Sequence, residues 1–172
     1  PSPLYIGEVI GFDHFHPEQT IKRHPDPEEP FSGFIFKTRI DPFAGKISYC
    51  RIRSGKINIG DEIYNVNKGV KEKINHLYMM NGKTMKEINT LEAGDIAVLA
   101  KIDSLSTGDT ITSVDKPLQY EPVRFPMPSY FVAIHSADRK SEDKLAEVFH
   151  LISQEDPTFT YSYNDITKEM VV

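Results

Sequence analysis

Turn-forming residues divide positions 31–116 into short segments, with a new turn about every ten residues, so no long helix fits there. In the segment 34–39, Phe34, Phe36 and Thr38 alternate with Ile35, Lys37 and Arg39, which is the two-residue period of a strand. The segment 96–101 is almost continuously apolar, which indicates a buried strand. We expect strands at residues 34–39, 47–53, 62–66, 71–79 and 96–101. Many short strands of this kind are typical of a β-sandwich or a β-barrel.

Two proline-rich stretches bound this region. Residues 24–30 read His-Pro-Asp-Pro-Glu-Glu-Pro, and a helix is excluded because each ring restricts φ and biases the preceding residue toward extended geometry. A second run of prolines between 117 and 128 marks a candidate domain boundary. We expect an extended lead-in strap at 1–30, a β-domain at 31–116, a linker at 117–128 and a second unit at 129–172.

The second unit has the pattern strand, helix, strand. Strands are expected at 130–135 and 159–163, with a further one starting at 169. Ser141 is a good N-cap for the helix, and Asp156-Pro157 ends it. The apolar face of that helix consists of Leu145, Val148, Phe149 and Ile152. One helix and two or three strands bury too little surface to stand alone. We therefore expect a fragment of a longer protein, or a half-domain that finds a partner, for example by pairing its strand edges in a dimer.

Composition excludes several classes of protein. The net charge is −5 and 39% of the residues are hydrophobic, which suits a soluble globular protein. No apolar run approaches the roughly 20 residues that cross a bilayer, so no membrane partner is expected. The single cysteine, Cys50, excludes an internal disulfide, and a cytoplasmic location fits best. As a lone strand cysteine, Cys50 is interpreted as a small buried apolar residue.

Nucleotide-binding motifs are incomplete. Gly82-Lys83-Thr84 could end a phosphate-binding loop, but position 77 is Leu where the motif needs glycine. Asn67-Lys68-Gly69 begins like a guanine-reading N-K-x-D loop, but position 70 is Val. We therefore expect no nucleotide hydrolysis, no cofactor and no catalytic residue in this chain.

Metal binding is not expected either. His14-x-His16, with Glu18 near it, could place two imidazoles on one face of a strand. A zinc site needs three or four ligands and supporting partners, so these side chains are interpreted as surface histidines.

Basic residues are the remaining candidates for a binding surface. The middle region is mildly basic between two acidic flanks, so contacts with phosphate are expected there. The basic side chains are Lys46, Arg51, Arg53, Lys56, Lys68, Lys71 and Lys73. Lysines and arginines on loops contact nucleic-acid phosphates, but these residues could equally be ordinary surface partners of Asp61, Glu62 and Glu72.

The order of the motifs resembles a known family. The matching segments are His24-Pro25-Asp26, Pro30-Phe31-Ser32, Phe36-Lys37, Asp41-Pro42-Phe43-Ala44-Gly45-Lys46, Ser54-Gly55, Gly60-Asp61, Lys68-Gly69-x-Lys71-Glu72-Lys73, Ala93-Gly94-Asp95-Ile96, Thr107-Gly108-Asp109-Thr110, Phe125-Pro126-x-Pro128 and Glu155-Asp156-Pro157-Thr158-Phe159. Over about residues 24–172, this order is similar to the second domain and the start of the third domain of elongation factor G. Residues 1–23 match less well.

The resemblance implies a fold and a function. The family consists of translational GTPases that act on the ribosome, and elongation factor G moves tRNA and mRNA after peptide transfer. Its second domain is a six-stranded β-barrel that contacts small-subunit rRNA and protein. Its third domain is a ferredoxin-like α+β unit, of which residues 129–172 would form the first half, β-α-β. GTP and Mg²⁺ would be bound by a GTPase domain elsewhere in the same parent chain.

The resemblance also implies site residues. Candidates for contact with the ribosome are Asp41, Phe43, Gly45 and Lys46 in one turn, and Lys68, Lys71 and Lys73 in a basic hairpin. Pro126, Pro128 and Thr158 match positions where the family's antibiotic, fusidic acid, wedges against the GTPase domain. Their alternative reading is structural, as linker prolines and a threonine after a helix.

Three other functions stay open at this point. The chain could come from a divergent paralogue, or from a ribosomal-protection or release-factor GTPase, although the turn 41–46 fits elongation factor G better. It could also be a β-barrel that binds a protein or a small ligand and has no role in translation. A P-loop and an N-K-x-D motif upstream of Pro1 would decide for a translational GTPase.

Overall fold

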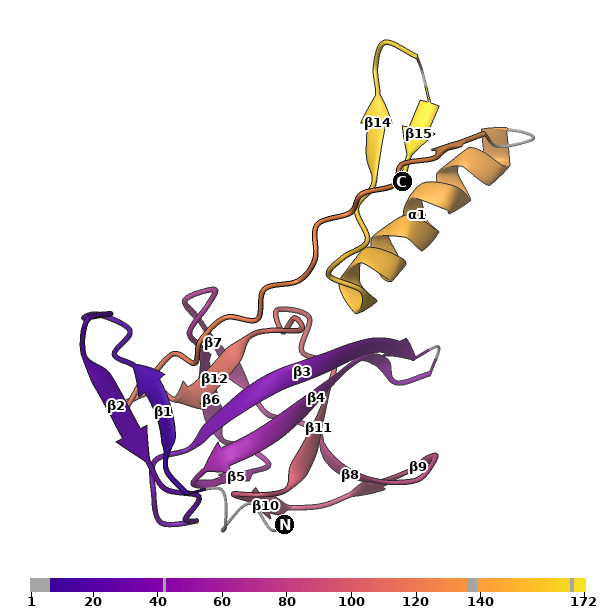
Figure 1. Cartoon of the computed structure of the whole chain (residues 1–172). Coiled ribbons are helices and arrows are strands. Elements are labelled where there is room, and N and C mark those ends of the chain that lie inside the picture. Colours follow the sequence, from indigo (N-terminus) through magenta and orange to yellow (C-terminus); the bar gives the residue numbers. More distant parts are fainter. Residues whose placement is uncertain (1–6, 42, 136–138, 168) are drawn as a thin grey trace. The chain divides into compact units, whose positions relative to one another are not determined.

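The structure is a computed structural model that describes all residues except 1–6, 42, 136–138 and 168 (Figure 1). The chain divides into two compact units, Pro1–Val123 and Arg124–Val172. Most of the regular structure is strand, and α1 (Arg139–Glu155) is the helix of the second unit. The mainly β fold expected from the turn pattern is confirmed.

The first unit contains a large antiparallel sheet. Its strands are β3 (Ser32–Asp41), β4 (Gly45–Ser54), β6 (Glu62–Asn65), β7 (Val70–Lys73), β8 (Leu77–Asn81), β9 (Thr84–Glu87), β11 (Ile96–Ala100) and β12 (Thr110–Ser113). Their order is β7-β6-β12-β3-β4-β11-β8-β9. In the described residues this sheet has eight strands where we expected six, since the segment 71–79 is interrupted at the buried Ile74 and the β8–β9 hairpin adds another strand.

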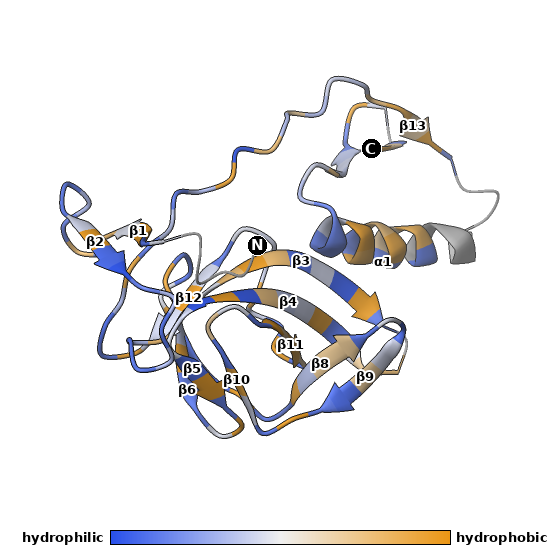
Figure 2. Ribbon diagram, turned by 60° about the horizontal axis from the view of Figure 1, so that its bottom comes forward, coloured by the Kyte–Doolittle hydropathy of each residue, from blue (hydrophilic) through white to orange (hydrophobic). Residues whose placement is uncertain are grey.

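Short connections curl this sheet around an apolar core, as expected for the barrel. The strands β5 (Lys56–Asn58) and β10 (Thr90–Glu92) pair with each other. The Gly60 amide donates to the Ile74 carbonyl at 2.7 Å, and the Ala93 amide donates to the Gly55 carbonyl at 2.9 Å. Buried and more exposed residues are mixed along β3 and β4, with a register shift between Ile35 and Lys37, and Figure 2 shows the hydropathy changing along both strands. The largest fully buried core side chains include Ile35, Ile52, Ile63, Leu77, Leu99 and Ile111.

The lead-in differs from the strap that we expected. Within it, β1 (Val9–Phe12) and β2 (Thr20–Arg23) pair as an antiparallel hairpin. The buried Arg23 guanidinium donates to the carbonyls of Pro30, Phe31 and Lys116, which attaches the hairpin to the rest of the unit. The prolines of 24–30 disfavour a helix only from residue 24 onward, and both strands of the hairpin precede them.

The start of the expected linker also belongs to the first unit. Leu118 and Tyr120 are buried, and the amides and carbonyls of Phe12 and Gln119 exchange hydrogen bonds at 2.7 and 2.8 Å. The Tyr120 hydroxyl lies 2.7 Å from the Ser32 hydroxyl on β3. The proline pattern could not reveal these contacts because they join residues far apart in the sequence.

The second unit has a three-stranded sheet in the order β13-β15-β14, with β13 (Ala133–Ile134), β14 (Ser162–Asn164) and β15 (Glu169–Val171). These strands are shorter than expected at 130–135 and 159–163. The expected N-cap was wrong, because α1 begins at Arg139 and Ser141 lies within its first turn. Phe149 of α1 is buried beside the rings of Phe159 and Tyr161. These contacts hold residues 159–161 against the helix, ahead of β14.

Within the described residues, no helix is both long enough and apolar enough to span a membrane. The same residues hold no group of three histidine, cysteine or acidic side chains placed to bind a metal ion.

Candidate nucleic-acid interface

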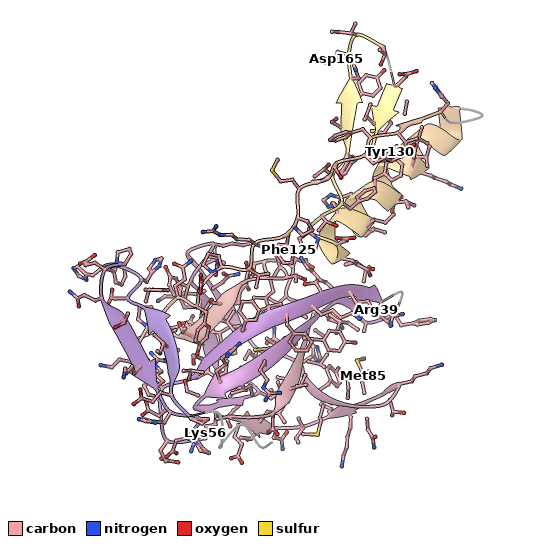
Figure 3. The ribbon with its side chains drawn as sticks, in the orientation of Figure 1. Arg39, Lys56, Met85, Phe125, Tyr130 and Asp165 are labelled. Carbon is pink, nitrogen blue, oxygen red and sulfur yellow. The ribbon has the colours of Figure 1, made fainter. Side chains whose placement is uncertain are left out.

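The turn between β3 and β4 presents an aromatic ring to solvent. The Asp41 carboxylate accepts hydrogen bonds from the amides of Phe43 at 2.9 Å and Ala44 at 2.8 Å. These bonds, from Ala44 first and Phe43 second, lower the pKa of Asp41. Gly45 closes the turn with a φ of 71°, and Phe43 is 97% exposed. Pro42 lies outside the described residues. Figure 3 labels Arg39 near the end of the same hairpin.

Lys46 points into the unit, although we expected it to contact phosphate. Its side chain is buried, and its ammonium donates to the Asp103 carbonyl at 2.8 Å. Burial lowers the pKa of Lys46, and the positive charge of Lys68 lowers it further. The structural role of Lys46 is therefore to support the loop that contains Asp103. Its ammonium is occupied by this internal hydrogen bond.

Lys68 contacts the same loop as Lys46. Its ammonium donates to the Ser104 carbonyl and, at 2.6 Å, to the Ser106 hydroxyl, and it lies 3.6 Å from the Asp109 carboxylate. Asp109 also accepts from the Asn65 side-chain amide at 2.7 Å. The carboxylate partner of Lys68 is thus Asp109, and within the described residues no ion pair joins the basic set to Asp61, Glu62 or Glu72.

Lys71 and Lys73 are the free lysines of the basic hairpin. Both lie on β7 and are exposed, opposite Tyr64 and Glu62 in the register with β6. In the part of the chain that the structure describes, neither ammonium has an ion-pair or hydrogen-bond partner. Their charges are therefore available to an anionic partner.

The candidates in the second unit lie in irregular segments, before β13 and between α1 and β14. Pro126 is exposed and Pro128 is half-buried, between Arg124 and β13. The amide and hydroxyl of Thr158 both donate to the Asp156 carboxylate, at 2.8 and 2.6 Å, directly after α1. This turn shows the structural role that we gave as the alternative for Thr158.

One arginine has aromatic partners that the sequence did not reveal. Arg53 lies over the ring of Tyr120, 5.2 Å from its centre, and 6.0 Å from the centre of Phe34. Phe34, Phe36 and Arg51 line a groove of about 500 Å³ beside it. The sequence held one signal for this groove. Phe34 and Phe36 are two residues apart in β3, and an alternating strand places such residues on one face.

Cys50 is buried, as interpreted from the sequence. Burial raises the pKa of its thiol to about 12, so the nucleophilic thiolate does not form near neutral pH.

Two family models match successive parts of the chain. The description "Elongation factor G domain 2" matches residues 30–114 and "Elongation Factor G, domain III" matches residues 125–172. Together the matches span the barrel and nearly the whole second unit. The chain belongs to the elongation factor G family. The motif order that suggested elongation factor G is thereby confirmed.

A solved structure is similar over most of this chain. It is a crystal structure of a protein from Thermus thermophilus, with a TM-score of 0.71 and 28% sequence identity. The match covers 83% of this chain and 22% of the Thermus thermophilus protein. This chain therefore spans about a fifth of the length of that protein.

Proposed function

We propose that this chain is the ribosome-docking part of an elongation factor G-type GTPase that moves tRNA and mRNA during protein synthesis. The observation that carries the proposal is the pair of family matches, to domain 2 at 30–114 and domain III at 125–172. GTP and Mg²⁺ would bind to the GTPase domain of the parent protein. The role of the residues described here is positioning, since they hold none of the motifs of nucleotide hydrolysis.

Two features of the barrel surface support contact with small-subunit rRNA. The exposed ring of Phe43 stands on a turn held by Asp41 and Gly45, and an exposed ring can stack on an unpaired base. The ammonium groups of Lys71 and Lys73, which have no partner among the described residues, can neutralise phosphates and release counterions. Lys46 and Lys68 act indirectly, because they support the loop that contains Asp103 and Asp109.

Two compact units suit a relay of conformational change. In this proposal each unit moves as a body when the GTPase domain changes its nucleotide state, and the motion reaches the ribosome through the barrel. Pro126, Pro128 and Thr158 would face the GTPase domain of the parent protein. The turn that Thr158 forms with Asp156 would then help to shape this surface.

Co-sedimentation with ribosomes tests the proposal. The intact parent protein should sediment with ribosomes in the presence of a non-hydrolysable GTP analogue and much less with GDP. A Lys71→Gln/Lys73→Gln variant should bind more weakly, and its slope of log affinity against log salt should be shallower by about 1.4–1.8, the value for two phosphate contacts.

The control variant is Lys83→Gln/Lys86→Gln. These lysines are exposed on the β8–β9 hairpin and give the same change of charge, so binding should stay close to that of the unsubstituted protein. Failure to co-sediment at low salt would refute ribosome docking. An equal loss of binding in both variants would refute the assignment of the contact to β7.

A further inference from the structure

A groove on the outer face of the barrel lies apart from the turn and the basic hairpin used above. Its floor comes from β3 and β4, through Phe34, Phe36 and Arg51, and from Ile96 at the start of β11. Its wall comes from the lead-in, through Val9 of β1 and the Pro25 that follows β2. All of these residues belong to the first unit, and the groove has a volume of about 500 Å³.

The floor exposes apolar surface that the core does not need. Phe36 and Ile96 are each 42% exposed, while their neighbours Ile35 and Ala97 are fully buried in the core. Outward-facing aromatic and aliphatic side chains in a concave site are characteristic of a ligand pocket. The volume lies in the range of roughly 300–1,000 Å³ that is typical of small-ligand sites.

The groove is also positively charged. In the described part of the chain, neither Arg51 nor Arg53 forms an ion pair with a carboxylate. The Arg53 Cζ atom lies over the Tyr120 ring, 5.2 Å from its centre, and over the Phe34 ring, 6.0 Å from its centre. A guanidinium held against rings keeps the N–H donors at its edge for an anion, and planar Arg donors match a phosphate with two parallel hydrogen bonds.

The aromatic floor and the two arginines together indicate the chemistry of a ligand. Aromatic side chains bind a flat ring by stacking, and two arginines that have no carboxylate partner among the described residues can bind an anion attached to that ring. We propose that this groove binds one unpaired nucleotide of a single-stranded RNA, with its base against Phe34 and Phe36 and its phosphate at Arg51 and Arg53. The choice of RNA rests on the proposed function, but the binding does not require a ribosome.

Fluorescence anisotropy with a labelled RNA hexanucleotide, oligo(A), tests this proposal on the 172-residue chain at low salt. Phe36→Ala and Arg51→Gln should each weaken binding about fivefold or more, the effect of losing one stacked base or one phosphate contact. Arg39→Gln is the matched control, because Arg39 is an exposed arginine of β3 that does not line the groove. It should bind like the unsubstituted chain.

An abasic hexamer separates stacking from charge. It should bind the unsubstituted chain at least as weakly as oligo(A) binds Phe36→Ala, because the abasic hexamer loses the stacking contacts with both Phe34 and Phe36. Photo-crosslinking of a hexamer that contains 4-thiouridine should label residues of β3 or β4, which tests the site without any substitution. Circular dichroism of each variant shows whether the fold is kept.

Three results would overturn the proposal. The first is equal affinity for the abasic and the complete hexamer, and the second is crosslinks only at residues that do not line the groove. The third is oligo(A) binding that Arg51→Gln and Phe36→Ala leave unchanged. Preferential binding of a short acidic peptide, lost in Arg51→Gln, would show that the groove takes a protein segment instead. These assays contain no ribosome. RNA binding in the groove can therefore fail while the parent protein still docks on ribosomes, and RNA binding can succeed while docking fails.

Discussion

At the residue scale, the environment of a charge decides what that charge can do. Lys46 and Lys73 are the same residue type in neighbouring parts of one barrel, but Lys46 is buried against the Asp103 carbonyl and Lys73 is exposed without a partner in the described part of the chain. Burial favours the neutral form of a lysine, so its pKa falls. Of these two lysines, the exposed Lys73 is the one whose ammonium can reach an external phosphate.

This burial of Lys46 predicts a dependence of stability on pH. The pKa of Lys46 is lower in the folded protein than its ordinary value of 10.5, so the unfolded chain binds the proton more tightly. The free energy of unfolding should therefore rise with pH between the lowered pKa of the folded protein and 10.5, because the unfolded chain binds more of this proton over that interval. Lys46→Met removes the titrating group and should lose this rise.

Urea unfolding at pH 8 and near pH 10 measures the effect. The difference in stability between the unsubstituted protein and Lys46→Met should move in favour of the unsubstituted protein at the higher pH. Lys71→Met is the control, since Lys71 is exposed on β7, and it should follow the unsubstituted protein at both pH values. A constant difference for Lys46→Met would contradict the prediction.

Glycine at position 55 is required by two constraints at once. Its φ is 70°, and a Cβ there would lie 2.5 Å from the Glu29 carbonyl oxygen and 2.6 Å from backbone atoms of Phe31. Gly45→Ala has the same strain, with a φ of 71°, but nothing lies within 4 Å of the added atom. We expect Gly45→Ala to cost about 1–2 kcal/mol and Gly55→Ala at least about 3 kcal/mol in the free energy of unfolding.

Urea titration of both variants separates the clash from the strain. The extra cost of Gly55→Ala over Gly45→Ala is the part due to the backbone of Glu29 and Phe31. Equal costs for the two variants would show that the backbone can move aside.

At the scale of the element, the β3–β4 hairpin shows how a turn is stabilised by a single side chain. Two ten-residue strands meet at Asp41 and Gly45, and the Asp41 carboxylate satisfies the amides of Phe43 and Ala44 within the turn. Such Asx-type hydrogen bonds compete well with water because the acceptor is charged and local. The exposed ring of Phe43 is thereby held at the end of a defined hairpin.

Loss of these hydrogen bonds should loosen the turn. In Asp41→Ala, hydrogen–deuterium exchange at the Phe43 and Ala44 amides should become several-fold faster, while the amides of β11 and β12 stay protected. Asp41→Asn keeps an acceptor oxygen and should stay close to the unsubstituted protein at neutral pH. Unchanged exchange in Asp41→Ala would mean that Gly45 alone determines the turn.

At the scale of the whole molecule, the two units differ in how much core they have. The core of Pro1–Val123 contains most of the buried aliphatic side chains, whereas Phe149 is the buried hydrophobic residue of Arg124–Val172 within the described range. A small core gives little stability, so the second unit should unfold first. The two units should then open in separate steps.

Phe149→Ala should therefore affect one unit only. Removal of the ring that packs on Phe159 and Tyr161 costs about 3–5 kcal/mol at a buried site, which is more than so small a unit can lose. In the variant, amides of α1 should lose protection from hydrogen exchange, while those of β3 and β4 keep it. Val148→Ala, at a 47% exposed position of α1, is the control and should keep the helix protected.

Much of the fold could be predicted because its signals are local. Alternation over two residues placed the strand 34–39, turn residues on either side placed the strands 47–53 and 62–66, and an Asp-Pro-Phe-Ala-Gly sequence placed the turn at 41–45. The start of α1 was placed too late, because Ser141 is only one of several residues that can begin a helix. The prolines correctly excluded a helix at residues 24–30. They gave no sign of the β1–β2 hairpin before them, so the prediction of an extended strap missed it.

The candidate site was less accessible to sequence patterns. Lys46, Lys68 and Lys73 look equivalent in the sequence, and only the structure separates two internal lysines from a free one within the described residues. The groove at Phe34 and Arg51 was missed because its opposite wall comes from Val9 and Pro25, in a segment interpreted as a strap.

The amino-acid sequence alone determined the class of fold, the turns and the family, since these depend on residues within a few positions of each other and on the order of motifs along the chain. The tertiary structure alone decided which charges are buried and which surfaces are hollow. Arg23 meets the Lys116 carbonyl across 93 positions, and Lys46 meets Asp103 across 57. Contacts over such separations depend on how the strands pair and pack, and the sheet order joins β12 to β3 and β11 to β4 in a way that no local pattern encodes.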